Sequence, residues 1–571
     1  MQQILPRFSR IPQSLKADTP HLLAIVAIWA MMVALVNPIG DFPLNDDWAF
    51  GRSVQHFLAT GQLKIADWGA MNQLIHLLWG ALFCLIFGFS FTTLRFSILI
   101  LGLIGVIVTY GILREANLSR KVALLGALSL ALNPVYFKLS NSFMTDVSFF
   151  TFSAFAFYFL VRSLKRDSWL EMIAGLSFAT CALLIRQLGL AIFIGFSCAY
   201  VAKKGWSLQN ICKGLSASFL GFALQLFYRE WLVMTNNLPA NYNLQTQEIL
   251  KAFAQGLGAI FLKISHNFMI AFLTLGLLTL PLMAILLINQ LPSLSRREKM
   301  LSLGFIGGFS MVSVVAFLLN RKTIYFWEVS SLGQFGLSPL LLRDYWRLST
   351  VLNQINLAGK IYGILLPIIG IFGASFLVYY CLLISRKIWF SESLFYERED
   401  RWLLVFAMSA TISYCLPLLL LERLMDRYLF FVIPLVFVAI GLSTPPLQKG
   451  NFTVFSTFIC SLILLLYGIS AVVFTHDYLS LNRTQWAATS NLVQELKVPP
   501  NQIDGGFEFN GWYLYDANYQ EKPNKSWWWV DRDDYVISLI PIGGYEEIKS
   551  YPIKKMLPLE PKNVLILRKT E

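Results

Sequence analysis

Charged residues are scarce in this sequence. Of its 571 residues, only 14% are Asp, Glu, Lys or Arg, whereas 56% are apolar or aromatic. A soluble core of this size could not hide so much apolar side-chain area, so the excess must face lipid. Apolar runs of about 20 residues, enough helix to cross a hydrocarbon layer of roughly 30 Å, recur from Ile25 to Phe474. The composition excludes a soluble protein and predicts an all-α polytopic membrane protein.

Signatures of metal, disulfide and nucleotide sites are also missing. The seven cysteines lie in or beside apolar segments and lack the paired spacing of a zinc site or a disulfide framework. No GxxxxGKS or GxxxxGKT motif occurs, and no GxGxxG follows a predicted strand, so nucleotide-driven chemistry has no support. The five histidines show no HExxH or other ligand spacing, so we predict no metal site from His21, His56, His76, His266 and His476.

The net charge of +13 is distributed as short basic clusters between apolar runs. No basic stripe is present, which argues against a nucleic-acid partner. Because Lys and Arg concentrate on cytoplasmic flanks, these clusters orient the helices. With the N-terminus inside, the cytoplasmic clusters are Arg7, Arg10 and Lys16; Arg114, Arg120 and Lys121; Arg162, Lys165 and Arg166; Lys203, Lys204 and Lys213; Arg296, Arg297 and Lys299; Arg386, Lys387, Arg398 and Arg401; and Lys449.

We predict about 13 membrane crossings, an odd number that places the C-terminus outside. The first apolar run, 21–38, lacks a small-x-small cleavage site near Val36 to Gly40, so we expect a retained helix. The segment from Asn72 to Phe91 would invert every later basic cluster if it crossed, so we predict a helix in the outer interface. The predicted spans begin near residues 22, 94, 122, 147, 170, 189, 214, 267, 301, 358, 402, 429 and 452.

The character of the chain changes after His476, where charged residues, Pro499-Pro500 and short β-rich pieces appear. We therefore predict three regions: a cytoplasmic segment over 1–21, a transmembrane domain over 22–474, and a small extracytoplasmic α/β domain over 475–571. Neither an internal repeat nor a low-complexity tract is visible.

Acidic residues stand on two of the predicted outer loops. Asp46 and Asp47 follow the first helix, and Asp146 begins the fourth. A carboxylate in such a place can take a proton from an incoming hydroxyl. Helix capping is the competing explanation for Asp46 and for Asp146 when each is taken alone. Together they predict a single acidic cavity on the outer face.

Cationic and aromatic side chains accompany these acids on the same side. Arg186 ends the fifth predicted helix, Arg427 precedes the twelfth, and Arg321 and Lys322 open a long outer loop. The planar donor fork of arginine suits a lipid phosphate, although snorkelling to the interface also accounts for an isolated Arg. The C-terminal tail is rich in aromatic residues, which either stack on sugar rings or lie in the interfacial belt: Trp512, Tyr513, Tyr515, Trp527, Trp528 and Trp529.

In order and side, these features resemble the polyprenyl-phosphate-sugar-dependent membrane glycosyltransferases of the GT-C fold, which include protein O-mannosyltransferases and lipid A aminoarabinose transferases. The resemblance is strongest over residues 20–200. Its elements are Asp46-Asp47, the helix from Leu74 to Phe87-Gly88, Leu94-Arg95, Asp146, Arg186, and Arg427-Tyr428 with Pro434. This chain departs from the family in having Asp-Asp for Asp-Glu, Arg186 for a frequent Lys, and Gly69-Ala70-Met71-Asn72 for a Lys-Pro-Pro.

The resemblance implies transfer of a sugar from a polyprenyl-phosphate donor to an acceptor hydroxyl outside the cytoplasm, with inversion. Asp46 or Asp47 would be the base and Asp146 would orient the base or the acceptor. The donor phosphate would bind Arg186, Arg427, Arg321 and Lys322. The implied partners are a lipid-linked sugar, a glycan, lipid or protein acceptor, and membrane lipids.

The implied location is the inner plasma membrane, and some members of this fold use a divalent metal, which the sequence does not identify. The rival hypotheses are a transporter or flippase, which usually shows repeated halves, and a polymerase of lipid-linked oligosaccharides.

Overall fold

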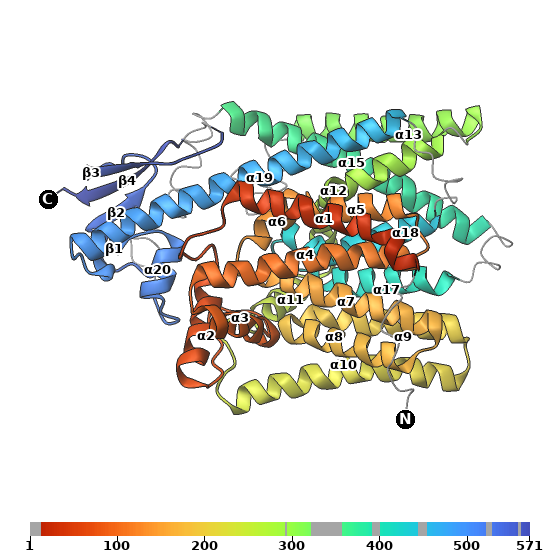
Figure 1. The fold of residues 1–571 in the computed structure, drawn as a ribbon, viewed down its shortest axis with the longest axis horizontal. Helices are drawn as coiled ribbons and strands as arrows, with labels where there is room; N and C mark the ends of the chain where they lie inside the picture. The colour runs from red at the N-terminus through yellow and green to blue at the C-terminus, as the bar shows by residue number, and fades with distance from the viewer. Residues whose placement is uncertain are drawn as a thin grey trace, which may run out of the picture.

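The computed structural model describes residues 13–291, 294–320, 357–390, 400–443, 454–520, 528–557 and 561–570. Helices dominate it, and a small sheet lies at one end (Figure 1). The helices are α1 (Gln13–Val36), α2 (Asp47–Thr60), α3 (Leu74–Phe87), α4 (Phe91–Glu115), α5 (Arg120–Ala131), α6 (Pro134–Ser140), α7 (Thr145–Arg166), α8 (Trp169–Ile185), η1 (Gln187–Gly189), α9 (Leu190–Lys204), α10 (Leu208–Met234), α11 (Leu244–Ala254), α12 (Leu257–Gln290), α13 (Arg296–Asn320), α15 (Leu357–Phe390), α17 (Arg401–Leu418), η3 (Asp426–Phe431), α18 (Val432–Ser443), α19 (Val454–Ser490), η5 (Asn491–Glu495), η6 (Pro500–Gln502) and α20 (Phe507–Leu514).

Every predicted span coincides with a helix, and the prediction of a polytopic helical membrane protein is confirmed. Within the described residues, nine helices are long and apolar enough to cross a membrane, or ten if α5 and α6, which meet at 63°, form one broken span. The predicted spans near 170, 189 and 429 correspond to the shorter helices α8, α9 and α18, of 17, 15 and 12 residues. A total of about 13 crossings therefore stays a prediction.

Helix α3 has 14 residues and covers roughly 21 Å at 1.5 Å per residue, short of a full crossing. Its length agrees with the expected interfacial helix.

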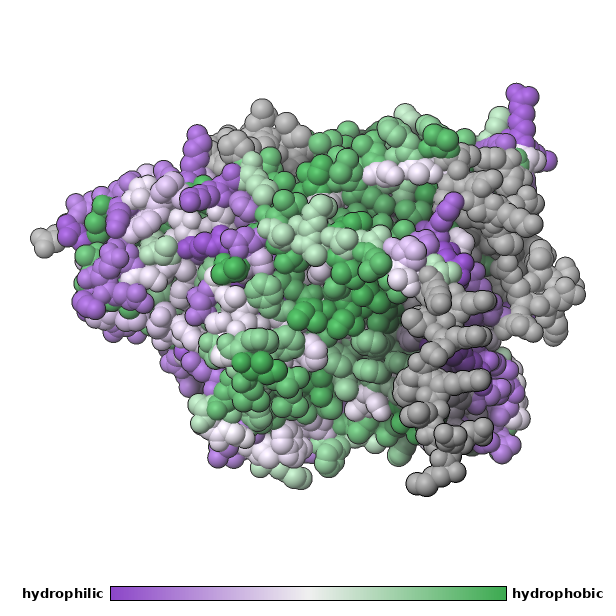
Figure 2. All heavy atoms as spheres, in the orientation of Figure 1, coloured by the Kyte–Doolittle hydropathy of each residue, from purple (hydrophilic) through white to green (hydrophobic). Residues whose placement is uncertain are grey.

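The loops predicted on opposite sides of the membrane gather at opposite ends of the bundle. Asp18 near the N-terminus pairs with Arg114 (3.5 Å) and Arg120 (2.9 Å), which joins two of the predicted cytoplasmic segments. The sheet, α2 and α20 lie at the other end (Figure 1). Apolar side chains form a broad band between more polar ends (Figure 2). This distribution supports the predicted alternation, and the side that each end faces remains a proposal.

Arg95 of α4 anchors the segment that leads from α1 to α2. Its guanidinium donates to the carbonyl oxygens of Pro38 (2.6 Å), Gly40 (3.0 Å) and Phe42 (2.9 Å). Arg95 is 1% exposed, so its charge is neutralised by these three dipoles and by nearby acids rather than by water. The arginine that opens the second predicted span therefore holds the first outer loop, residues 37–90 between α1 and α4, in place.

The C-terminal part forms the predicted α/β unit. Its sheet has the order β1-β2-β4-β3, with β1 (Ile503–Asp504) parallel to β2 (Tyr535–Ser538) and the other pairs antiparallel. The strands β3 (Tyr545–Pro552) and β4 (Asn563–Lys569) complete it. The prediction of strands at 535–539 and 563–567 is confirmed. The helix α19 runs without interruption through residue 475, the predicted start of this unit, and carries the sheet on its last turns.

Candidate active site

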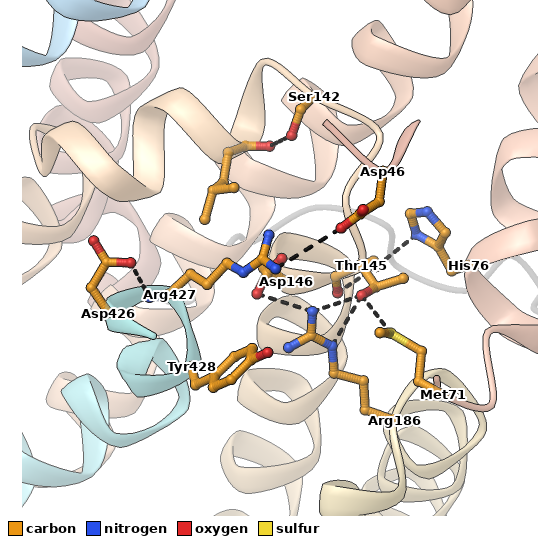
Figure 3. A network of polar contacts seen from close by, with 12 residues as sticks. Asp46, Met71, His76, Ser142, Thr145, Asp146, Arg186, Asp426, Arg427 and Tyr428 are labelled. Atoms are coloured by element: carbon orange, nitrogen blue, oxygen red, sulfur yellow. Dashed lines mark hydrogen bonds and ion pairs between the residues drawn. The ribbon is translucent and has the colours of Figure 1, made fainter. Parts of the chain in front are cut away.

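Asp46 faces the centre of a polar network at the sheet end of the bundle (Figure 3). Its Oδ1 accepts a hydrogen bond of 2.8 Å from the indole Nε1 of Trp68, and its Oδ2 lies 4.0 Å from Nη2 of Arg427. Burial raises the pKa of Asp46, while the charge of Arg427 and the bond from Trp68 oppose that rise. A carboxylate whose pKa is raised toward neutrality is a better general base than a solvated one.

Asp47 points away from that network, into the protein. Its Oδ2 accepts hydrogen bonds from the backbone N–H groups of Leu44 (3.3 Å) and Phe143 (2.9 Å), which ties the first outer loop to the turn before α7. The residue is 1% exposed, and burial raises its pKa to about 8. The sequence left the choice between Asp46 and Asp47 open, and the geometry favours Asp46 as the base.

Asp146 and Arg186 form a buried ion pair. Nη2 of Arg186 lies 2.9 Å from Oδ1 of Asp146, and the two side chains are 8% and 1% exposed. Thr145 accepts hydrogen bonds at its Oγ1 from Nε (3.0 Å) and Nη2 (2.7 Å) of the same arginine. Arg186 has an extended backbone at the end of α8, which turns its side chain toward the first turn of α7. Held in this way, Arg186 is preorganised rather than snorkelling.

Arg427 extends from η3 between the two carboxylates Asp46 and Asp146 (Figure 3). Its guanidinium carbon lies 5.8 Å from the ring centre of Tyr428, and its backbone N–H donates to Asp426 at 2.7 Å. The Nε of Arg427 and the Oδ2 of Asp146 are buried and have no hydrogen-bond partner in the described part of the chain. A buried polar atom without a partner costs about 1–3 kcal/mol. These atoms therefore mark a place that a polar ligand would complete.

Two cations and two carboxylates thus come together from separate segments: the loop before α2, the first turn of α7, the end of α8, and η3. The site has no net charge when all four groups are ionised, and the Nε–H of Arg427 is a donor without a partner in the described residues. Such a site can accept one anion and can offer one carboxylate to a hydroxyl. Arg321 and Lys322, predicted to join this set, lie outside the described residues.

Three neighbours of the site were missed at the sequence level. Trp68 donates to Asp46, Glu508 accepts from the first outer loop, and Lys138 of α6 places its ammonium 4.2 Å from the ring centre of Tyr478. The charges of Asp426 and Arg427 act on Lys138, which is 9% exposed. A lone lysine inside an apolar run is a functional candidate by default, so Lys138 could have been found. No sequence signal points to Glu508.

Four of the tail aromatics pack against aromatic side chains from the segment between α1 and α4. Trp512, Tyr515, Trp528 and Trp529 pack around Trp48 and Trp68 of the first outer loop, with neighbouring ring centres 5.0–6.2 Å apart. Trp529 is buried and the other three rings are partly buried, so stacking on sugar rings and a place in the interfacial belt both stay predictions. Tyr513 is 44% exposed, and Trp527 lies outside the described residues.

The bond from Trp68 yields a prediction about pH. Because the indole N–H stabilises the charged form of Asp46, Trp68→Phe is expected to raise the pKa of Asp46 further. A base works when it is deprotonated, so the acidic limb of kcat/KM against pH should move to higher pH, and the rate below that limb should fall. Trp206→Phe, at an exposed tryptophan outside the site, is the control. An unmoved limb, or one at lower pH, would contradict this.

Residues 75–228 match the sequence model of the dolichyl-phosphate-mannose-protein mannosyltransferase family. The predicted resemblance is confirmed over this segment. The matched segment contains Asp146 and Arg186, whereas Asp46 and Arg427 lie outside it. A mannosyltransferase is a glycosyltransferase, so the prediction of an enzyme of that class is confirmed at the level of the family, and the transporter hypothesis is not favoured. No curated protein matches the chain.

Three solved structures are similar to the chain, each with a TM-score of 0.40 or lower. The Saccharomyces cerevisiae Pmt1-Pmt2 complex bound to the sugar donor is 18% identical, with a TM-score of 0.31 over 39% of this chain and 35% of that chain. ArnT from Cupriavidus metallidurans bound to undecaprenyl phosphate is 12% identical, with a TM-score of 0.40 over 96% of this chain and 97% of that chain. An Archaeoglobus fulgidus oligosaccharyltransferase tethered with an acceptor peptide is 12% identical, with a TM-score of 0.29 over 76% of this chain and 56% of that chain.

The chain spans about a third of the yeast protein that it matches, and likeness at these TM-scores assigns no activity by itself.

Proposed function

We propose that this protein transfers a sugar from a polyprenyl-phosphate donor to an acceptor hydroxyl, with Asp46 as the general base. The observation that carries the proposal is the opposition of Asp46 and Arg427, 4.0 Å apart in a buried site where Arg427 has a donor to spare. A base and a phosphate-binding cation are the two groups that such a transfer needs. The match to a mannosyltransferase family over the segment that holds Asp146 and Arg186 supports it.

In the proposed mechanism, the donor phosphate takes the place of Asp46 as the partner of Arg427. The planar fork of Arg427 binds the phosphate, and Arg186, fixed by Asp146 and Thr145, adds a second positive charge. Losing its countercharge to the phosphate raises the pKa of Asp46 and makes it a stronger base. Binding of the donor would therefore activate the base that the reaction uses.

The transfer is a single displacement. The acceptor oxygen forms a bond to the anomeric carbon while the bond from that carbon to the phosphate oxygen breaks, which inverts the configuration. The hydroxyl proton passes to Asp46, and the polyprenyl phosphate leaves with one more negative charge than the donor carried. Arg427 and Arg186 stabilise that charge as it develops, in a site shielded from water. Asp146 holds Arg186, so its proposed part is to position a cation.

We further propose that the reaction takes place on the extracytoplasmic face of the inner membrane, with the N-terminus in the cytoplasm. The proposed regions are 1–21, 22–474 and 475–571. Asp46 and Asp146 share one end of the bundle with the sheet, opposite the end that holds Asp18 and Arg114, which supports this orientation. In the described residues, no three His, Cys, Asp or Glu side chains gather as a metal site, and no step above requires a metal.

A transfer assay tests the proposal. Purified protein in lipid nanodiscs would be incubated with radiolabelled polyprenyl-phosphate hexoses and pentoses and with glycan, lipid and peptide acceptors. We expect label on one acceptor class, with the opposite anomeric configuration to the donor by NMR. A retained configuration, or movement of the labelled lipid across a proteoliposome membrane with no transfer, would contradict the proposal and favour the flippase hypothesis.

A further inference from the structure

The backbone just before Asp46 is held in an unusual conformation. Asn45 has φ of 53°, in the left-handed region that non-glycine residues rarely occupy. Such a conformation persists only when surrounding contacts impose it. Its N–H donates a hydrogen bond of 3.1 Å to Oε1 of Glu508, a residue 463 positions later in the chain. The hydrogen bond from Asn45 to Glu508 therefore helps to fix the backbone of Asn45, and with it the direction of the Asp46 side chain.

Glu508 stands on a support that is itself fixed to the first outer loop. A Cβ on Gly511 of α20 would lie 2.4 Å from the Trp48 ring, so α20 and α2 touch at a glycine. Arg52 of α2 donates to the carbonyl oxygen of Trp512, and its guanidinium lies 5.8 Å from the centre of that indole. With the surrounding aromatic rings, these contacts leave Glu508 little freedom to move.

A carboxyl group is an unfavourable choice for this place on structural grounds alone. Burial and, to a smaller extent, the charge of Asp46 raise the pKa of Glu508 to about 7, although hydrogen bonds from two backbone N–H groups oppose that rise. Its carboxylate accepts hydrogen bonds from its own backbone N–H and from the N–H of Asn45, and the bond from Asn45 is the one that reaches the first outer loop. An apolar residue of the same size would avoid the cost of burying a carboxyl group and the repulsion from Asp46. It would leave the N–H of Asn45 without an acceptor.

We infer that Glu508 is a positioning residue for sugar transfer, which holds Asn45 in its left-handed conformation and so aims Asp46 at Arg427. The C-terminal unit is then a working part of the active site rather than an appended domain. This inference rests on the proposed function of Asp46. It extends that function by making the base depend on a residue that the transmembrane helices do not supply.

Three variants of the full-length protein test the inference. Glu508→Leu removes the acceptor, and misplacing a reacting group by about 1 Å can cost on the order of 100-fold, so kcat should fall roughly 10- to 100-fold with the KM for the donor unchanged. Glu508→Gln keeps an acceptor oxygen and should restore most of kcat. Glu547→Gln, at an exposed residue of β3, is the matched control and should behave as the unaltered protein.

Amide hydrogen exchange supplies a readout that is independent of catalysis. In the absence of substrate, Glu508→Leu should speed exchange at the Asn45 amide, and Glu508→Gln should not. Gly511→Ala displaces α20 while keeping Glu508. Like Glu508→Leu, it should speed exchange at the Asn45 amide and lower kcat. Unchanged kcat and unchanged protection in Glu508→Leu would overturn the inference. If the unaltered protein transfers no sugar, the proposed function fails, whereas the exchange measurement still decides whether Glu508 holds the loop.

Discussion

Replacing Asp46 with Asn is expected to lower kcat for sugar transfer by roughly 10³-fold, because Asn cannot take the hydroxyl proton that the transition state releases. Asn keeps the size of the side chain and can still accept the bond from Trp68, so the fold and the KM for the donor should change little. The measurement is steady-state transfer from a saturating lipid-phosphate sugar, with the thermal midpoint recorded for each variant. A kcat within a fewfold of the unaltered enzyme would remove Asp46 as the base.

Two further variants separate that effect from a general loss of charge. Asp67→Asn, at an exposed position in the connection between α2 and α3, should leave transfer unchanged. Asp47→Asn keeps an oxygen that accepts from the N–H groups of Leu44 and Phe143, so it should retain most of the activity. Full loss in Asp47→Asn together with a working Asp46→Asn would reverse the assignment that the geometry favours.

The second large effect is expected at Arg427. Arg427→Lys keeps a positive charge near Asp46 but loses the planar fork that binds two phosphate oxygens at once. Removing one preorganised donor from a developing anion typically costs about 10²–10³-fold in kcat, and we expect a loss of that size here. Inhibition by free polyprenyl phosphate should weaken in parallel, because the same donors bind the product.

Arg423→Lys is the matched control for Arg427→Lys, since Arg423 lies just before η3 and is exposed. It should leave both kcat and product inhibition unchanged. If Arg427→Lys also left both quantities unchanged, the phosphate would bind elsewhere and the proposed exchange of partners at Arg427 would be wrong.

Much of the fold could be predicted because a lipid environment imposes long apolar runs. Each predicted span has its helix, and the tail strands at 535–539 and 563–567 are where short β-rich pieces stand. The predicted total of about 13 crossings depends on α8, α9 and α18, which are short. Packing decides whether helices of this length cross, and composition does not report packing. Polar residues after His476 mark the exit from the membrane, whereas α19 itself continues to Ser490.

The candidate site was predictable in its parts and not in its geometry. The order and side of Asp146 and Arg186 indicated a shared cavity, and the structure brings the two together as an ion pair of 2.9 Å. Which of the adjacent residues Asp46 and Asp47 faces that cavity depends on Trp68 and Phe143, partners from other segments. Glu508 is the extreme case, because its contact with Asn45 spans 463 positions and no local pattern announces it.

A structure of the Asp46→Asn variant with a polyprenyl-phosphate sugar bound would show directly whether Asp46 and Arg427 have the proposed roles. We expect the phosphate on the guanidinium of Arg427, beside Arg186, with the anomeric carbon facing residue 46. It also predicts that residue 46 no longer pairs with Arg427 once the phosphate is there. A phosphate bound away from both arginines, or a sugar on the far side of Asp146 from residue 46, would contradict the account.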